Sequence, residues 1–404
     1  MRRELKYPLL LVGLAYLGFV SLGLPDGLNG VAWPSIRTYF HLPIDALGWL
    51  LVMFTAGYLV SSFSSGRLLA LMSIRTLLAL SCLATAVSLI GYALAPAWLV
   101  MVALGSVAGF GAGAIDAGLN TFAATQFNAR MVNWLHACYG IGAATGPVIM
   151  TGVLAGHHPW QRGYLIVGGW QLLLAFCFAL TRKRWVMPGA SGGLKGSSEI
   201  AVARVSNMST LKLPVVRLSI AVFFVYTGIE AAAGYWAYTL FTESRAVSLM
   251  TAGVWVSIYW GCLTVGRLLS GIVIEHIAIQ RLLRVCLVSI AMGAVLIWLG
   301  GASFLSIAGL GLMGLASAPV FPSLISATAV RLGEEHIANG VGFQIAAAVL
   351  GQSLLPTVVG VLARRIGLEV IGPTLLVAAC LLIALFEALS WASPEAGREA
   401  PAMT

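Results

Sequence analysis

The chain has 404 residues, of which 59% are hydrophobic and only 9% are charged, and its formal net charge is +9. Soluble domains carry about 25% charged residues, so this composition excludes a water-covered surface and indicates a chain embedded in lipid. The basic balance does not indicate nucleic-acid binding, because Lys and Arg of membrane proteins gather in cytoplasmic loops. The six cysteines lie in apolar stretches without metal-ligand spacing, so we interpret them as reduced packing residues and predict no metal or cofactor.

Twelve apolar stretches are long enough to span a bilayer as helices. They cover residues 8–36, 45–65, 74–94, 97–126, 131–155, 161–181, 214–240, 247–274, 280–300, 302–330, 337–363 and 368–391. The segment after the sixth stretch begins Arg182-Lys183-Arg184 and is rich in Gly and Ser, which predicts a flexible cytoplasmic linker over 182–213. We therefore predict an all-α membrane protein of two pseudo-symmetric six-helix bundles, residues 1–181 and 214–404.

The distribution of basic residues predicts the orientation. With the N-terminus in the cytoplasm, most Lys and Arg fall in cytoplasmic segments, as the positive-inside rule requires. The exceptions are Arg37, Arg162, Arg245, Arg364 and Arg365. We predict a multi-pass protein of the cytoplasmic membrane, with both termini cytoplasmic, that works as a monomer.

A short internal repeat supports the division into halves. Gly66-Arg67-Leu68-Leu69 closes the second stretch and recurs as Gly266-Arg267-Leu268-Leu269 at the end of the eighth. Parallel six-helix repeats are one architecture of membrane transporters.

These features resemble the major facilitator superfamily, whose loop after the second helix reads G-x-x-x-D-R-x-G-R. The first half lacks the Asp and keeps Arg75 at the close of the loop, whereas the second half has Glu275 in the acidic place. The resemblance implies a gating role for Arg67, Arg75, Arg267 and Glu275.

Within the superfamily, three stretches are similar to the fucose:proton symporter group. They are residues 23–30 followed by Trp33-Pro34-Ser35, the Gly-rich run 109–113 followed by Asp116 and Asn120, and residues 133–147 beginning Asn-Trp-Leu-His. The resemblance implies that Asp26, in the first helix, takes part in proton-coupled transport. It also places Asp116 near an acidic position of the fourth helix.

Three acidic residues fall inside predicted spans: Asp26, Asp116 and Glu230. A charge at bilayer depth costs at least about 2.5–3.5 kcal/mol on insertion scales, and the default reason for tolerating it is a solute or ion pathway. We predict that all three carboxyl groups couple transport to protons. The alternatives are that Asp26 caps a helix broken at Pro25, that Asp116 only stabilises packing, and that Glu230 binds solute.

Amides and aromatic rings near these carboxyl groups suit a polyhydroxylated ligand. Asn29 and Trp33 follow Asp26 at i+3 and i+7, which predicts one shared helix face. The predicted substrate-binding residues are Asn29, Trp33, Asn120, Asn133, His136, Tyr235, Gln344 and Gln352. Gln344 and Gln352, eight residues apart, are expected on one face. For each of these side chains a packing role is the alternative.

We therefore hypothesise proton-coupled symport of a small polar, sugar-like solute by alternating access, with the solute, protons and lipid as partners and no nucleic acid. The motif Gly142-x-x-x-Gly146-Pro147 resembles a signature of drug:proton antiporters, so efflux of a drug or metabolite is the alternative. A non-transporting sensor on the same fold is a third reading. No Walker loop or HExxH motif occurs, and the G-x-S-x-G string at residues 189–193 lies in the predicted linker rather than in a nucleophile elbow between a strand and a helix, so an enzyme is not predicted.

Overall fold

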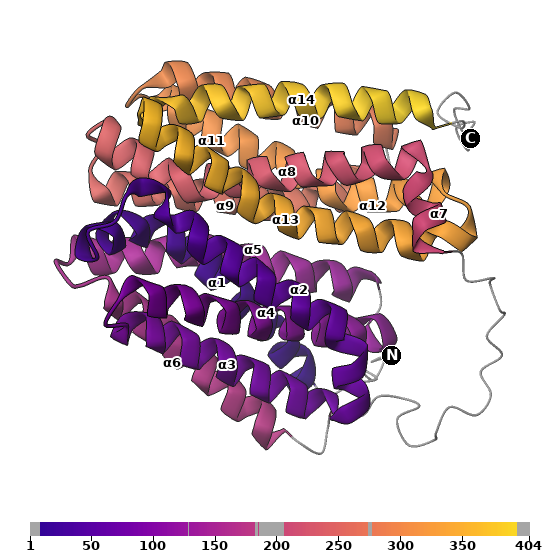
Figure 1. Ribbon diagram of the computed structural model, residues 1–404, viewed down its shortest axis with the longest axis horizontal. Coiled ribbons are helices and arrows are strands. Elements are labelled where there is room, and N and C mark those ends of the chain that lie inside the picture. Colours follow the sequence, from indigo (N-terminus) through magenta and orange to yellow (C-terminus); the bar gives the residue numbers. More distant parts are fainter. Residues whose placement is uncertain (1–8, 128, 182–184, 186–205, 274–276, 394–404) are drawn as a thin grey trace, which may run out of the picture.

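The computed structural model describes residues 9–127, 129–181, 185, 206–273 and 277–393. Over these residues the regular elements are all helices, and twelve spans are long and apolar enough to cross a membrane (Figure 1). The predicted all-α class and the count of twelve spans are confirmed.

The first six spans form one packed group. They are α1 (Leu9–Tyr39), α2 (Leu47–Leu71) after the short helix η1 (Ile44–Ala46), α3 (Ile74–Leu94), α4 (Trp98–Gln126), α5 (Ala129–Ala155) and α6 (Gln161–Leu180). Within this half, α1 packs on α5, α2 on α4, and α3 on α6 and α4.

The second six spans repeat this packing. They are α8 (Pro214–Thr239) with the π-turn η2 (Leu240–Ser244), α9 (Leu249–Val273), α10 (Ile279–Gly300), α11 (Phe304–Ser317) with α12 (Val320–Arg331), α13 (Glu334–Ile366), and α14 (Ile371–Ala392) after the short helix η3 (Leu368–Val370). Here α8 packs on α13, α9 on α11, and α10 on α14 and α11. The sequence repeat thus corresponds to a repeat of helix pairs.

The tenth span differs from the expected continuous helix, because it breaks between α11 and α12 at Pro319. Proline has no backbone N–H to donate within a helix, which accounts for the break. Within the predicted linker, residues 207–212 form α7 (Asn207–Lys212). The Thr210 hydroxyl of α7 is hydrogen-bonded to His336 Nδ1 of α13 at 2.8 Å.

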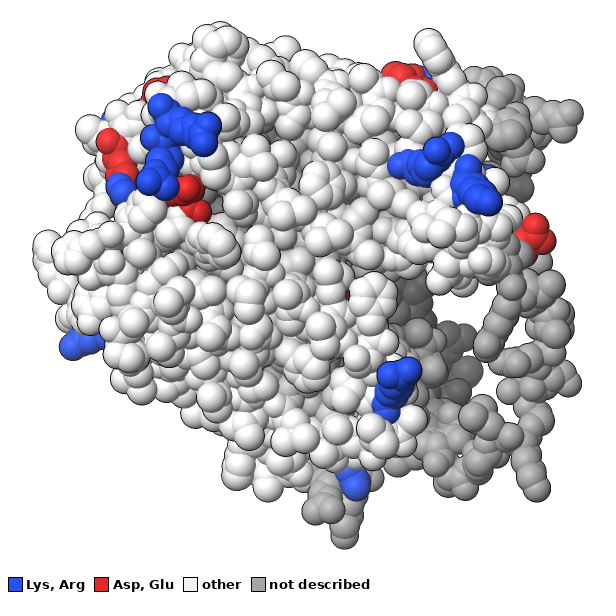
Figure 2. All heavy atoms as spheres, in the orientation of Figure 1, with Lys and Arg blue, Asp and Glu red and all other residues white. Residues whose placement is uncertain are grey.

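The outer surface is apolar over the length of the spans. Large side chains point outward along it, among them Leu99, Phe176, Val285 and Val377. In the face that Figure 2 shows, charged residues lie toward the ends of the helices and the middle is white. Such a surface suits hydrocarbon, where charges are expensive.

We call the end of the bundle at which α7 lies the linker end, and the other the opposite end (Figure 1). At the opposite end, ion pairs join the two halves. Arg37 of α1 pairs with Glu243 of η2 at 2.5 Å, and Arg364 of α13 pairs with Asp45 of η1 at 3.3 Å.

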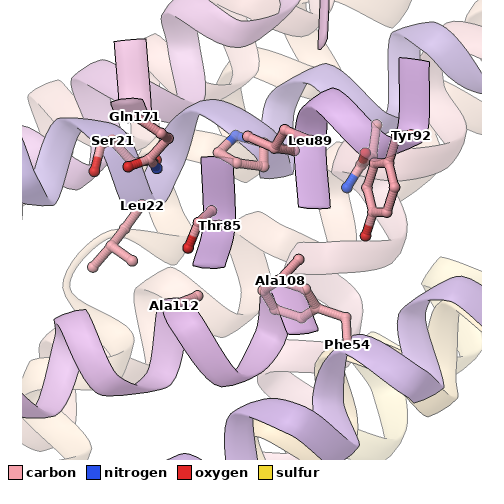
Figure 3. A pocket seen from close by; sticks show the side chains of 11 residues that line it. Ser21, Leu22, Phe54, Thr85, Leu89, Tyr92, Ala108, Ala112 and Gln171 are labelled. Carbon is pink, nitrogen blue, oxygen red and sulfur yellow. The ribbon is translucent and has the colours of Figure 1, made fainter. Parts of the chain in front are cut away.

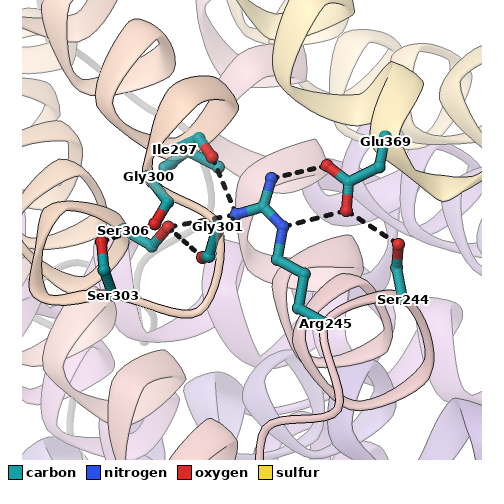
Figure 4. Close-up of polar contacts among 8 residues, drawn as sticks. All are labelled: Ser244, Arg245, Ile297, Gly300, Gly301, Ser303, Ser306 and Glu369. Carbon is teal, nitrogen blue, oxygen red and sulfur yellow. Dashed lines mark hydrogen bonds and ion pairs between the residues drawn. The ribbon is translucent and has the colours of Figure 1, made fainter.

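Arg245 makes several polar contacts at the opposite end of the second half (Figure 4). Its side chain is only 5% exposed, and it pairs with Glu369 at 2.7 Å. It also donates to the carbonyl oxygens of Ile297 and Gly301 and to the Ser306 hydroxyl. Arg37, Arg245 and Arg364 are among the exceptions to the positive-inside pattern, and each has a carboxylate partner.

Candidate proton and solute site

Close contact between α1 and α5 positions Asp26. A Cβ added at Gly27 would overlap the carbonyl oxygen of Ala143, and one at Gly142 would overlap that of Val20. Glycine at these positions lets the two backbones touch, as small residues do between membrane helices. The contact brings the α1 carboxylate within reach of α5 side chains.

The Asp26 carboxylate lies where the two halves meet. The Tyr139 hydroxyl of α5 donates to Asp26 Oδ2 at 2.6 Å, and the Tyr235 hydroxyl of α8 donates to Oδ1 at 3.3 Å. Because α8 belongs to the second half, one carboxylate is hydrogen-bonded to both halves. The pairing of Asp26 with Tyr235 joins two residues that the sequence singled out separately.

The backbone hydrogen bond that Pro25 removes within α1 is replaced by one from another helix. Pro25 cannot donate to the carbonyl of Ser21, four residues earlier. Gln171 of α6 donates to that carbonyl instead, at 3.1 Å. Ser21, Pro25 and Gln171 line a cavity of about 20 Å³, enough for one water molecule, together with Asn29, Thr85 and Tyr92 (Figure 3).

Asp116 forms a polar group inside the first half. The Tyr58 hydroxyl of α2 donates to Asp116 Oδ2 at 2.6 Å, and the Asn120 amide donates to Oδ1 at 2.9 Å. The i, i+4 pairing expected of Asp116 and Asn120 is therefore present. The Tyr58 bond joins α2 to α4, the Asn120 bond lies within α4, and both are equally what a packing role requires.

Glu230 is the most enclosed of the three carboxylates. Its side chain is 7% exposed, and the Tyr226 hydroxyl lies 2.5 Å from its Oε2. Its Oε1 lies 3.8 Å from Arg267 of α9. The Tyr259 hydroxyl donates to the Glu230 backbone carbonyl at 2.8 Å, which ties α9 to α8.

Each membrane carboxylate thus has a tyrosine hydroxyl within 2.6 Å. The sequence analysis did not single out Tyr58, Tyr139 or Tyr226. Tyr226 could have been found, since it stands four residues before Glu230 and so on the same helix face. Tyr58 lies on another helix from Asp116, and no spacing in the sequence connects the two.

The expected face of Asp26, Asn29 and Trp33 is divided in the structure. Asn29 accepts a hydrogen bond from Tyr164 of α6 at 2.7 Å. Trp33 is fully buried and donates to the carbonyl of Ile44 at 3.0 Å. Trp33 is therefore enclosed at the opposite end of the first half, and the expectation that it presents an aromatic plate beside Asp26 is wrong. The reason is that η1 folds back over the end of α1 and covers the indole.

The two glutamines of α13 also lie in different surroundings. Gln344 is buried and hydrogen-bonded to Ser219 and Thr328, whereas Gln352 is exposed. A spacing of eight residues leaves two side chains about 80° apart around a helix with 3.6 residues per turn, so the expected single face is not formed.

The remaining predicted residues are distributed as follows. His136 of α5 is exposed, and its ring packs edge-on against Phe19. The side chain of Asn133 and the whole of Glu275 lie outside the described residues.

The predicted gating arginines occupy unlike places. Arg67 is exposed toward the linker end of α2, and Arg75 is half-buried in the first turn of α3. Arg267 instead faces Glu230 from within α9, and its guanidinium carbon lies 5.8 Å from the ring centre of Tyr139. The two copies of the repeat have thus diverged in their surroundings.

Two six-helix halves with buried carboxylates at their junction define a membrane transporter rather than an enzyme. The chain belongs to the Major Facilitator Superfamily, whose family model matches residues 15–356.

Known relatives and structures agree with this family. The chain is 28% identical over 138 residues to a putative glucose/galactose transporter of Helicobacter pylori (strain ATCC 700392 / 26695), a match that covers 34% of this chain and 33% of that protein. The matched region therefore spans about a third of the length of the curated relatives.

Three solved structures share the fold at low identity. A bacterial homolog of the human lysosomal transporter Spinster, inward-facing and unoccupied, superposes with a TM-score of 0.77 at 13% identity, covering 98% of each chain. A D-xylose-proton symporter gives 0.75 at 14%, covering 93% of this chain and 97% of its own. The transporter FucP in its outward conformation gives 0.62 at 14%, covering 94% and 99%.

Proposed function

We propose that this protein is a proton-coupled symporter for a small polar, sugar-like solute, and that Asp26 carries the coupled proton. The observation that supports the proposal is the hydrogen bond from Tyr235 of the second half to Asp26 of the first. A carboxylate held between the halves changes its surroundings whenever they move. Proton binding and rocking are then linked, because protonation removes the charge that both tyrosine hydroxyls stabilise.

The solute class rests on chemistry and on likeness. Tyrosine hydroxyls and carboxylates are hydrogen-bond partners suited to a polyol. The partial relative is named as a putative glucose/galactose transporter, and two of the structural neighbours are a fucose:proton symporter and a D-xylose-proton symporter. We place the protein in the cytoplasmic membrane as a monomer, with the linker end toward the cytoplasm.

The test compares two transport modes in proteoliposomes, with a panel of neutral and acidic sugars. Asp26→Asn is expected to abolish uptake driven by a proton gradient and to spare counterflow exchange. Glu387→Gln makes the same chemical change on the surface of α14, where Glu387 pairs with Arg284, and should leave both modes intact. Concentrative uptake by Asp26→Asn at the wild-type rate would refute the assignment.

Proton-driven export is the second candidate, favoured by the antiporter-like run from Gly142 to Pro147. In the structure Gly142 and Gly146 meet the backbone of α1, so the motif makes a tight helix contact that serves either direction. The direction of solute flux against an imposed proton gradient separates the two. Solute leaving the compartment that protons enter would replace symport by antiport.

A further inference from the structure

Arg267 is a positive charge placed at the junction of the halves with much of its hydrogen-bonding capacity unused. Its side chain is 21% exposed, so part of it faces open space. Within the described chain, its guanidinium donates no hydrogen bond shorter than 3.5 Å, and its nearest carboxylate oxygen is the Glu230 Oε1 at 3.8 Å. A guanidinium carries five N–H donors, so at least four have no close acceptor among the described residues.

The contacts of Tyr226 explain why Arg267 and Glu230 do not form a close, hydrogen-bonded ion pair. The Tyr226 hydroxyl lies 2.5 Å from Glu230 Oε2 and 2.8 Å from the carbonyl oxygen of Ser317. A hydroxyl has one hydrogen, and the Ser317 carbonyl can only accept. The single hydrogen of the Tyr226 hydroxyl is therefore shared between Glu230 Oε2 and the Ser317 carbonyl, and Oε2 contacts Tyr226 rather than Arg267. Only Glu230 Oε1 faces Arg267, and at 3.8 Å it lies beyond hydrogen-bond range.

The Arg267 guanidinium lies against a residue of the first half. The guanidinium lies 5.8 Å from the ring centre of Tyr139, within the range of a cation–π contact. The same tyrosine donates to Asp26. A ligand anion bound by Arg267 would therefore lie near the carboxylate to which we assign the coupled proton.

From this geometry we propose that Arg267 binds the carboxylate of the transported solute, and that the solute is a sugar acid rather than a neutral sugar. A planar guanidinium matches a carboxylate with two parallel hydrogen bonds, which an ammonium cannot reproduce. The inference rests on the proposed transport function and narrows its substrate class.

The test measures binding of matched pairs to the purified protein by intrinsic tryptophan fluorescence. D-glucuronate is compared with D-glucose, and D-galacturonate with D-galactose, because each pair differs only by a carboxylate in place of a hydroxymethyl group. At least one acid is expected to bind about tenfold or more tightly than its neutral parent. Arg267→Gln should lose that preference while binding the neutral parents as before. Arg267→Lys should keep part of it, because the charge remains without the fork.

Arg284→Gln is the matched control, since Arg284 lies on the surface of α10 in an ion pair with Glu387 and should leave the preference unchanged. Neutral sugars that bind as tightly as the acids, absence of binding by both acids, or equal weakening of all ligands in Arg267→Gln would each overturn the proposal. Tighter binding of glucose 6-phosphate than of either uronate would assign the site to phosphate and overturn the carboxylate. Proton-driven uptake of a neutral sugar would support the proposed transport function but refute the proposal that the solute is a sugar acid. Loss of proton-driven flux for every solute would instead refute the function.

Discussion

Replacing Gln171 by Leu is expected to destabilise the first half, because it removes the donor that satisfies the Ser21 carbonyl beside Pro25. Gln171 is fully buried, and Leu has a similar volume, so little cavity is created. The main effect of the substitution is to leave the buried Ser21 carbonyl without a hydrogen-bond donor, which costs about 1–3 kcal/mol. Water admitted to the small adjoining cavity would bring the loss toward the lower figure.

A double-mutant cycle isolates the cause. Pro25→Ala restores a backbone N–H that can donate to Ser21 within the helix, so Gln171→Leu should cost less in that background. We expect a coupling energy of about 1–2 kcal/mol, measured by unfolding in mixed micelles of mild detergent and SDS. Additive effects of the two substitutions, within about 0.3–0.5 kcal/mol, would show that Gln171 does not compensate for the proline.

Three further changes test other parts of the structure. Arg37→Gln removes the ion pair with Glu243 that joins the halves at the opposite end. This change should favour separation of the halves there by about 0.2–1 kcal/mol, measured as faster labelling of a cysteine placed at that end. Unchanged labelling would show that the ion pair does not hold the halves together. Arg245→Ala should lower stability by about 2–3 kcal/mol in a thermal unfolding assay, because two loop carbonyls lose a charged donor. A loss below about 0.5 kcal/mol would show that Arg245 does not stabilise this loop. Gly142→Ala should cost about 1–3 kcal/mol through overlap with α1, whereas Gly152→Ala on the same helix meets no neighbour and should be tolerated; equal effects would argue against the close contact.

The spans were predictable from sequence because hydrocarbon demands long apolar segments with internally satisfied backbones. The third span, 74–94, has the predicted bounds, and most other ends lie within a few residues of the expected ones. The break at Pro319 was missed, because the apolar run continues on both sides of it. Composition reports where a chain enters lipid but not where a helix is interrupted within it.

The candidate site was predictable only in part. Carboxylates at bilayer depth identified Asp26, Asp116 and Glu230 as unusual, and the structure supplies each with a tyrosine partner. Which neighbours they meet depends on helix rotation and on contacts between distant segments, which single-helix spacing does not contain. Trp33 shows the limit, because its spacing suggests a shared face with Asp26 while the distant carbonyl of Ile44 holds its indole.

Proton movement through reconstituted protein tests the central role of Asp26 most directly. Vesicles loaded with a pH-sensitive dye are given the solute that the binding panel selects, with no imposed gradient. We predict that the wild-type protein acidifies the vesicle interior as solute enters, and that Asp26→Asn exchanges labelled solute without moving protons. Acidification by Asp26→Asn at the wild-type rate would contradict the account.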